Sequence, residues 1–104
     1  MDVEGVARLL AAGDAVALDV REPFEWHAGR MPGAIHIPMG ELAQRTDELP
    51  RERTIVAVCR SGNRSGTVTE ALRHAGYRAV NLDGGMKAWV RAALPLELPG
   101  GGIA

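Results

Sequence analysis

Short, mostly apolar runs recur along the chain and predict buried β-strands. The clearest run is residues 54–58, which is continuous and rich in the β-branched side chains that favour extended backbone. Residues 15–20 form a similar run, interrupted by Asp19 near its end. Two shorter runs, residues 34–38 and 79–82, complete the set. Continuous apolar runs of this kind are typical of strands that are covered on both faces.

Apolar residues between these runs recur with the spacing of helices. The first helix carries apolar side chains at positions 3, 6, 7 and 10, with Asp2 placed to cap its start and Gly13 to follow its end. Similar spacing predicts a helix that begins near Arg64, another over residues 86–93, and a weaker candidate over residues 41–49. Strands that alternate with helices predict an α/β fold with a mainly parallel central sheet.

Length and charge limit the organisation of the chain. Its 104 residues suit one domain, which we expect over residues 1–94, with a flexible C-terminal tail over residues 95–104 where prolines and glycines accumulate. Twelve basic residues against 13 acidic ones give a formal net charge of -1, so the whole molecule has no general attraction for nucleic acid or for a membrane surface.

The apolar runs and the N-terminal residues indicate the cellular location of the protein. No apolar run approaches the roughly 20 residues that a membrane span needs. The N-terminus carries the acids Asp2 and Glu4 where a secretory signal would carry basic residues, so we expect a cytoplasmic protein.

Cys59 is the single cysteine, which excludes an intramolecular disulfide and a multi-cysteine zinc site. The three histidines, His27, His36 and His74, lack the spacing of a metal-binding motif. His36 is better explained as a partly buried strand residue with satisfied hydrogen bonds. We therefore expect no metal and no organic cofactor.

The segment 59–65, called the Cys59 loop below, joins the end of the clearest strand to the next helix. Ligands of parallel α/β proteins bind beyond the carboxyl ends of strands, where helices begin. Gly62 can adopt backbone angles that turn successive N–H groups toward an anion, and two arginines add positive charge close to the thiol. These effects favour the thiolate, so we predict that Cys59 is the catalytic nucleophile. The predicted substrate-binding residues are Arg60, Ser61, Gly62, Asn63, Arg64 and Ser65.

The two arginines of the loop have different expected roles. Arg64, close to the helix start, suits a fixed structural role, whereas Arg60, directly after Cys59, suits the mouth of the site. A competing interpretation is an inert cysteine followed by an ordinary polar loop whose arginines are merely solvated.

Three separated motifs resemble those of the rhodanese family: residues 18–34, the Cys59 loop, and residues 81–89 with the sequence NLDGGMKAW. The resemblance implies a rhodanese-like fold, with a mostly parallel, five-stranded central sheet flanked by helices on both sides. It also implies that Asp19 and Arg21 hold the fold near the Cys59 loop. Arg30 departs from the family, which often has histidine at this position.

The resemblance implies a thiosulfate sulfurtransferase, in which a Cys59 persulfide carries sulfur from a small anionic donor such as thiosulfate, or from a persulfide, to a thiophilic acceptor. That acceptor would be cyanide in vitro, and a thiol or an acceptor protein in cells. No partner cysteine is present in the chain, so the sulfur must leave to another molecule.

Two alternative functions remain open from the sequence. A cysteine phosphatase or an arsenate reductase also uses a cysteine before an arginine-containing loop, but only four residues separate Cys59 from Arg64, where related phosphatases have a longer loop. A noncatalytic rhodanese-like interaction module is the other alternative, and the presence of Cys59 weighs against it.

Overall fold

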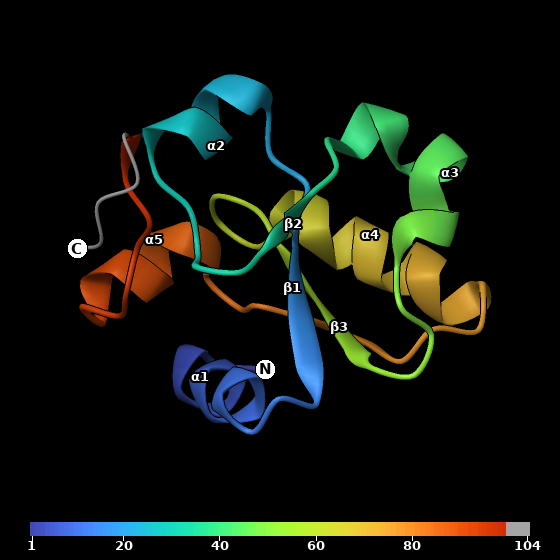
Figure 1. The fold of residues 1–104 in the computed structure, drawn as a ribbon, viewed down its shortest axis with the longest axis horizontal. Helices are drawn as coiled ribbons and strands as arrows, with labels where there is room; N and C mark the ends of the chain where they lie inside the picture. The colour runs from blue at the N-terminus through green and yellow to red at the C-terminus, as the bar shows by residue number, and fades with distance from the viewer. Residues whose placement is uncertain (100–104) are drawn as a thin grey trace.

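The computed structural model describes residues 1–99, in which strands and helices alternate along the chain (Figure 1). The four strands are β1 (Ala15–Asp19), β2 (Ile35–His36), β3 (Thr54–Val58) and β4 (Ala79–Asn81). The helices are α1 (Val3–Ala11), α2 (Pro23–Ala28), α3 (Leu42–Arg45), α4 (Asn63–His74) and α5 (Gly85–Arg91), and the 3-10 turns η1 (Met39–Glu41) and η2 (Thr46–Glu48) flank α3.

The strands form one parallel sheet in the order β2-β1-β3-β4, which confirms the α/β fold class. The expected number of five strands is corrected to four within residues 1–99. Further pairing outside the sheet is limited there to one antiparallel bridge, between Arg30 and Glu97. Pro95 and Pro99 flank that bridge, and because proline has no N–H to donate, the bridge cannot extend into a longer ladder.

Alternate residues of the central strands face opposite sides of the sheet. Ile55 and Ala57 of β3 pack on the side that α3 and α4 cover, whereas Val56 and Val58 pack with α1 and α5 on the other side. Figure 1 shows the same two layers of helices, one on each side of the strands. Helices therefore cover both faces of the sheet, which explains why the central strands β1 and β3 are mostly apolar.

The observed helices match the predictions from the sequence at α1 but differ from them at residues 41–49 and at α2. The side chain of Asp2 accepts a hydrogen bond from the Gly5 N–H at 2.8 Å, which confirms the predicted N-cap of α1. The weak helix candidate over residues 41–49 is broken into η1, α3 and η2. Helix α2 was not predicted, because none of its residues is buried and it carries no apolar stripe.

Residues 95–99, the described part of the predicted flexible tail, lie against the domain. The Trp89 Nε1–H donates to the Pro95 carbonyl at 2.8 Å, and the Arg30 guanidinium pairs with the Glu97 carboxylate at 2.7 Å. The remainder of the predicted tail lies outside the described residues. Arg30, the position that departs from the family pattern, thus has a structural partner in this chain.

Within residues 1–99, no helix has the length and apolar character that crossing a membrane would require. The cytoplasmic location stays a prediction.

Candidate active site

The Cys59 loop begins where β3 ends and leads directly into α4. Cys59 is almost completely buried, with 1% of its surface exposed, and it packs with the core residues on the α4 side of the sheet. Gly62, the residue before α4, has a φ of 101°, in the left-handed region that glycine adopts without strain. This turn brings the first N–H groups of the helix back over the sulfur.

Donors of the Cys59 loop converge on the Cys59 Sγ atom. The Gly62 N–H lies 3.1 Å from the sulfur, the Ser65 N–H 3.3 Å, and the Ser65 hydroxyl oxygen 3.2 Å. Helix N-termini carry unpaired N–H groups and partial positive charge, so this geometry suits a negatively charged sulfur. The structure thus brings two N–H groups and one hydroxyl of the Cys59 loop to the sulfur atom.

The first two carbonyl groups of the loop, those of Cys59 and Arg60, accept hydrogen bonds from the start of α5. The Met86 N–H donates to the Cys59 carbonyl at 2.8 Å, and the Lys87 N–H donates to the Arg60 carbonyl at 3.0 Å. Gly85 makes this approach possible, because a Cβ atom there would lie 2.5 Å from the Cys59 carbonyl oxygen. Helix α5 thus holds the carbonyl side of the loop at Cys59 and Arg60, while N–H groups of Gly62 and Ser65 contact the sulfur.

The surroundings of Cys59 change the acidity of its thiol. Burial opposes ionisation, but hydrogen bonds from the Ser65 hydroxyl and from the N–H groups of Ser65, Gly62 and Ser61 outweigh it and hold the pKa of Cys59 below its ordinary value of 9.0. A larger fraction of the thiol is therefore ionised near neutral pH than in a free cysteine, and the thiolate is the nucleophilic form.

The two loop arginines occupy different positions. Arg64 pairs with Glu25 through two hydrogen bonds of 3.0 and 3.1 Å. This pairing, above all, lowers the pKa of Glu25 and raises that of Arg64, whose charge also interacts with Cys59. Arg60 is exposed and lines a neighbouring pocket. The sulfur is held by hydroxyl and amide donors, and neither guanidinium hydrogen-bonds to it in the described residues.

The remaining predicted site residues contribute less through their side chains. Ser61 is exposed and supplies its backbone N–H, and Asn63 is the exposed first residue of α4. The structure thus brings together Cys59, Gly62 and Ser65 most closely.

Asn81, at the end of β4, is a site residue that the sequence analysis missed. Its side-chain oxygen accepts a hydrogen bond from the Ser65 hydroxyl at 2.5 Å, and its side-chain nitrogen donates to the Gly62 carbonyl at 3.1 Å. A hydroxyl has one proton, so Ser65 can donate to Asn81 or to the sulfur, but not to both at once. Asn81 lies in the third motif, directly before the residues that support the Cys59 loop, and this position was the signal in the sequence that could have identified it as a site residue.

Asp19 and Arg21 form a buried ion pair beside the site, with 2.7 Å between Nη2 and Oδ2. The same guanidinium donates to the Gly29 carbonyl at 2.8 Å, which ties β1 to the end of α2. Helix α2 carries Glu25, so this pair positions the partner of Arg64, in agreement with the structural role that the resemblance implied.

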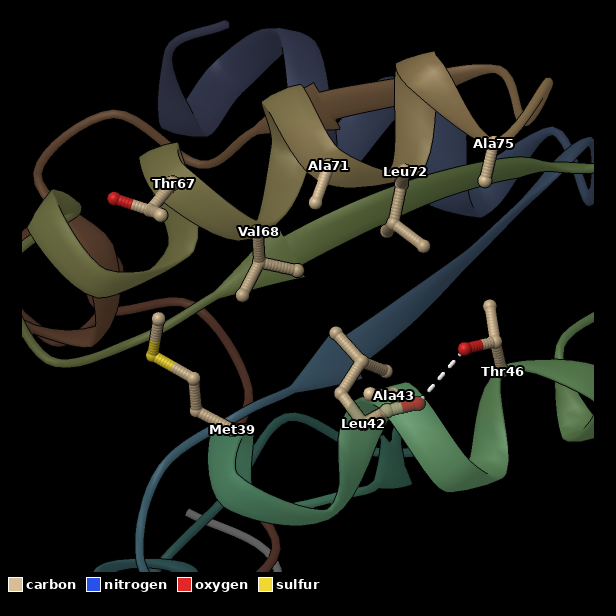
Figure 2. A pocket seen from close by; sticks show the side chains of 9 residues that line it. All are labelled: Met39, Leu42, Ala43, Thr46, Thr67, Val68, Ala71, Leu72 and Ala75. Carbon is tan, nitrogen blue, oxygen red and sulfur yellow. Dashed lines mark hydrogen bonds between the residues drawn. The ribbon is translucent and has the colours of Figure 1, made fainter.

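Two of the hollows among the described residues differ in their lining. The first, called the charged pocket below, has a volume of about 550 Å³ and is lined by Arg21, Glu25, Ala28, Arg60, Met86, Lys87, Val90 and Arg91. The second, the apolar groove, has a volume of about 250 Å³ and lies between α3 and α4 (Figure 2). It is lined by Met39, Leu42, Ala43, Thr46, Thr67, Val68, Ala71, Leu72 and Ala75.

No group of three or more histidine, cysteine, aspartate or glutamate side chains in residues 1–99 lies close enough together to hold a metal ion. His36 instead contacts the Arg21 carbonyl through Nε2 at 2.9 Å and stacks on Trp26. The structural interpretation of this histidine is confirmed.

Comparison with known proteins gives a consistent result. The sequence model of the rhodanese-like domain matches residues 2–92. A sulfurtransferase from Allochromatium vinosum is 39% identical over 103 residues, which cover 97% of this chain and 96% of that protein. The crystal structure of a rhodanese-related protein from Thermoplasma volcanium superposes with a TM-score of 0.87 at 30% identity, covering 92% of this chain and 94% of the other. A helix-turn-helix transcriptional regulator from Mycobacterium tuberculosis is 42% identical over 88 residues, which are 83% of this chain but 39% of the regulator.

Proposed function

The chain belongs to the rhodanese family of sulfurtransferase-related enzymes, and we propose that it transfers sulfane sulfur from thiosulfate, or from a persulfide donor, through a persulfide on Cys59. The observation that carries the proposal is the convergence of two N–H groups and one hydroxyl on a single buried sulfur. Such an arrangement is preorganised for a negatively charged sulfur atom and needs no metal.

In the first half-reaction the Cys59 thiolate attacks the outer sulfur of thiosulfate. A bond forms between Sγ and that sulfur, the S–S bond of thiosulfate breaks, and its electron pair leaves with sulfite. The product is an anionic Cys59 persulfide. The N–H groups of Gly62 and Ser65 are placed to stabilise its terminal sulfur because they already surround Sγ.

In the second half-reaction a nucleophilic acceptor attacks the terminal sulfur of the persulfide. The S–S bond at Cys59 breaks, and its electron pair returns to Sγ as the thiolate. Cyanide is a suitable laboratory acceptor, and a thiol or an acceptor protein would serve in cells.

Mass spectrometry of the intact protein tests the proposal directly. After treatment with thiosulfate the chain should gain the mass of one sulfur atom at Cys59, and cyanide should remove it. The Cys59→Ser variant should gain nothing and should lose at least about a thousandfold of sulfur transfer, since a serine hydroxyl is a far weaker nucleophile than a thiolate. Transfer that persists in this variant would contradict the assignment of the nucleophile.

The same preparation separates sulfur transfer from phosphatase or arsenate reductase chemistry. Because the loop between Cys59 and Arg64 is short, hydrolysis of an aryl phosphate and reduction of arsenate should be negligible beside thiosulfate turnover. Efficient phosphatase activity without persulfide formation would overturn the proposed function.

A further inference from the structure

The side chain of Asn81 contacts two parts of the Cys59 loop. Its amide nitrogen donates to the Gly62 carbonyl at 3.1 Å, and its amide oxygen lies 2.5 Å from the Ser65 hydroxyl oxygen. A backbone carbonyl can only accept a hydrogen bond, so the contact with Gly62 fixes which end of the amide is nitrogen and leaves the oxygen facing Ser65. Asn81 therefore offers the Ser65 hydroxyl an acceptor.

The fold holds this acceptor close to the loop. Asn81 is the last residue of β4 and pairs with Ala57 of β3, the strand that leads into the Cys59 loop. A Cβ atom built at Gly62 would lie 3.6 Å from the Asn81 Nδ2 atom, and one built at Gly66 would lie 3.8 Å from it. The amide thus lies directly against the start of α4, the helix that carries Ser65.

The Ser65 hydroxyl has two acceptors within reach and only one proton. The Cys59 Sγ atom lies 3.2 Å from the hydroxyl oxygen on one side and the Asn81 Oδ1 atom on the other, and Ser65 is completely buried. A buried hydroxyl needs a partner, and a charged acceptor forms a hydrogen bond roughly twice as strong as a neutral one. The hydroxyl therefore donates to Sγ when Sγ is a thiolate, and to Asn81 when Sγ is uncharged.

Sulfur transfer moves the negative charge away from Sγ. In the persulfide, Sγ is bonded to Cβ and to a second sulfur atom, and the terminal sulfur carries the charge. An uncharged sulfur with two covalent bonds is a weak acceptor, as in methionine. The amide oxygen of Asn81 is then the better partner for the Ser65 hydroxyl.

We propose that Asn81 is a positioning residue for sulfur transfer, which accepts the Ser65 hydrogen bond while Cys59 carries the persulfide and yields it to Sγ when the thiolate returns. This inference rests on the proposed persulfide on Cys59. Because the hydroxyl keeps a partner in both states, loading with sulfur leaves no buried donor unsatisfied. Asn81 thereby raises the fraction of the enzyme that carries sulfur.

The equilibrium that Asn81 shifts balances without another reactant. The Cys59 thiolate and thiosulfate give the Cys59 persulfide anion and sulfite, so one S–S bond breaks, one forms, and the total charge is the same on both sides. The Ser65 proton stays on its own oxygen throughout, and only the direction of its hydrogen bond changes.

The experiment measures the equilibrium constant of loading. Enzyme is incubated with thiosulfate and sulfite at several fixed ratios, and mass spectrometry of the intact protein gives the fraction that carries the extra sulfur. The pH is kept above the midpoint of every variant's alkylation profile, so that Cys59 starts as the thiolate in each protein. A residue that only supports the fold has no reason to move this constant.

Asn81→Leu removes the acceptor and keeps a side chain of similar size. The loading constant should fall about fivefold, because the Ser65 hydroxyl loses its partner in the persulfide state alone. The lost contact with the Gly62 carbonyl is the same in both states and cancels. Asn81→Ala removes the same acceptor by truncation and is measured beside it, so that either variant that folds decides the result.

Ser65→Ala should shift the loading constant the other way, upward by about fivefold, because the bond lost to the thiolate is stronger than the bond lost to the amide oxygen. Adding Asn81→Leu to Ser65→Ala should then change nothing further, since no hydroxyl is left for Asn81 to accept. Thr69→Val is the control. It removes a buried hydroxyl that donates to the Ser65 carbonyl at 2.8 Å, and it should keep the wild-type constant.

An unchanged constant in Asn81→Leu and Asn81→Ala overturns the proposal, as does a fall of the same size when residue 65 is already alanine. A lower constant in Ser65→Ala also overturns it, because the hydroxyl then stabilises the terminal sulfur of the persulfide. These outcomes leave sulfur transfer intact. Wild-type enzyme that forms no persulfide at any ratio of thiosulfate to sulfite overturns the proposed function itself, and this is seen before any variant is compared.

Discussion

The charged pocket and the apolar groove are both spaces left open by the packing of helices, but they differ in the properties that chemistry requires. The groove lies between α3 and α4, and Figure 2 shows the side chains of the two helices facing each other across it. It has no charged lining residue, and one of its hydroxyls, that of Thr46, is already bonded to the Leu42 carbonyl at 2.8 Å. The charged pocket lies beside the Cys59 loop, and three of its cations, Arg60, Lys87 and Arg91, form no ion pair within residues 1–99.

An apolar hollow alone offers no charge and no nucleophile to a substrate. The groove lies between the four-residue helix α3 and helix α4, and alanines of both helices are among the residues that line it. The Cys59 site is marked instead by its place at the carboxyl end of β3 and by donors that converge on one atom. Substitutions on the two sides should therefore have very different effects on activity.

Gly85→Ala should produce the largest effect among the variants that keep Cys59. The added Cβ would lie 2.5 Å from the Cys59 carbonyl oxygen and 2.6 Å from the Arg60 carbonyl carbon, so the loop must move. A shift of about 1 Å at the reacting atoms can reduce catalysis on the order of a hundredfold, which we expect for thiosulfate turnover.

Gly13→Ala is the matched control for this variant. Gly13 also has a positive φ, of 82°, but nothing lies within 4 Å of a Cβ built there. Both substitutions incur the backbone strain of an alanine in the left-handed region, about 1 kcal/mol or more, and only Gly85→Ala displaces the Cys59 loop. Equal losses of turnover in the two variants, with unfolding measured in parallel, would contradict the proposed support of the loop by α5.

Ser65→Ala should have the next largest effect. Loss of the hydroxyl removes a donor to the sulfur, so the pKa of Cys59 should rise and a smaller fraction should be thiolate at neutral pH. The profile of alkylation rate against pH should move to higher pH, and thiosulfate turnover should fall about tenfold, as expected for one lost hydrogen bond to a charged group.

Asn81→Leu sharpens this result because it removes the competing acceptor of the Ser65 proton. If Asn81 takes that proton from the sulfur, the alkylation profile of Asn81→Leu should move in the opposite direction from that of Ser65→Ala. Shifts to higher pH in both variants would show that Asn81 mainly positions Ser65 for the sulfur.

The sequence predicted those parts of the fold and site whose residues are close together in the chain. Strand β3 is a continuous apolar run, and the Cys59 loop is one segment of seven residues, so both could be recognised locally. Helix α2 escaped prediction because none of its residues is buried. The expected fifth strand is absent from residues 1–99; that number came from the resemblance and not from the pattern of apolar residues.

Contacts between distant residues could not be predicted in the same way. Glu25 meets Arg64 across 39 positions, and Asn81 reaches Ser65 only because β4 lies beside β3 in the sheet. Arg30 was an unexplained departure until its partner Glu97 appeared 67 positions later. Charge and motif identify candidates for such contacts, but the partner depends on how the chain packs.

Glu25→Gln should have a smaller effect than the variants that touch the sulfur. The substitution leaves Arg64 without its carboxylate partner, while the donors to Sγ stay in place. Because Arg64 is 37% exposed, we expect a cost of no more than about 1 kcal/mol and a fall in turnover of about fivefold or less.

The pH dependence of stability identifies this ion pair independently. The pKa of Glu25 is lower in the folded chain than its ordinary value of 4.5, chiefly through the hydrogen bond from Arg64. The contribution of the pair is therefore present above that ordinary value and is lost as the pH falls below it, through the lowered pKa. Wild type and Glu25→Gln should differ in unfolding free energy at neutral pH and converge in acid. A difference that persists unchanged in acid would contradict this origin.

Filling the apolar groove should have the smallest effect on catalysis. This prediction tests whether the groove, unlike the charged pocket, is unnecessary for sulfur transfer. Ala71 is an exposed residue of α4 that lines the groove, so Ala71→Leu adds apolar atoms where about 250 Å³ of space is open. The added contacts with Met39 and Leu42 should change the unfolding free energy by no more than about 1 kcal/mol, in the stabilising direction if the side chain fits. Ala71→Ser, which adds a polar group of small volume, is the control. Persulfide formation and its discharge by thiols should match the wild type in both variants, because the groove supplies no charge and no donor to Cys59. Ala71→Leu contradicts this prediction if it retains its stability but loses thiosulfate turnover or persulfide discharge. Such a result would show that the groove takes part in substrate binding.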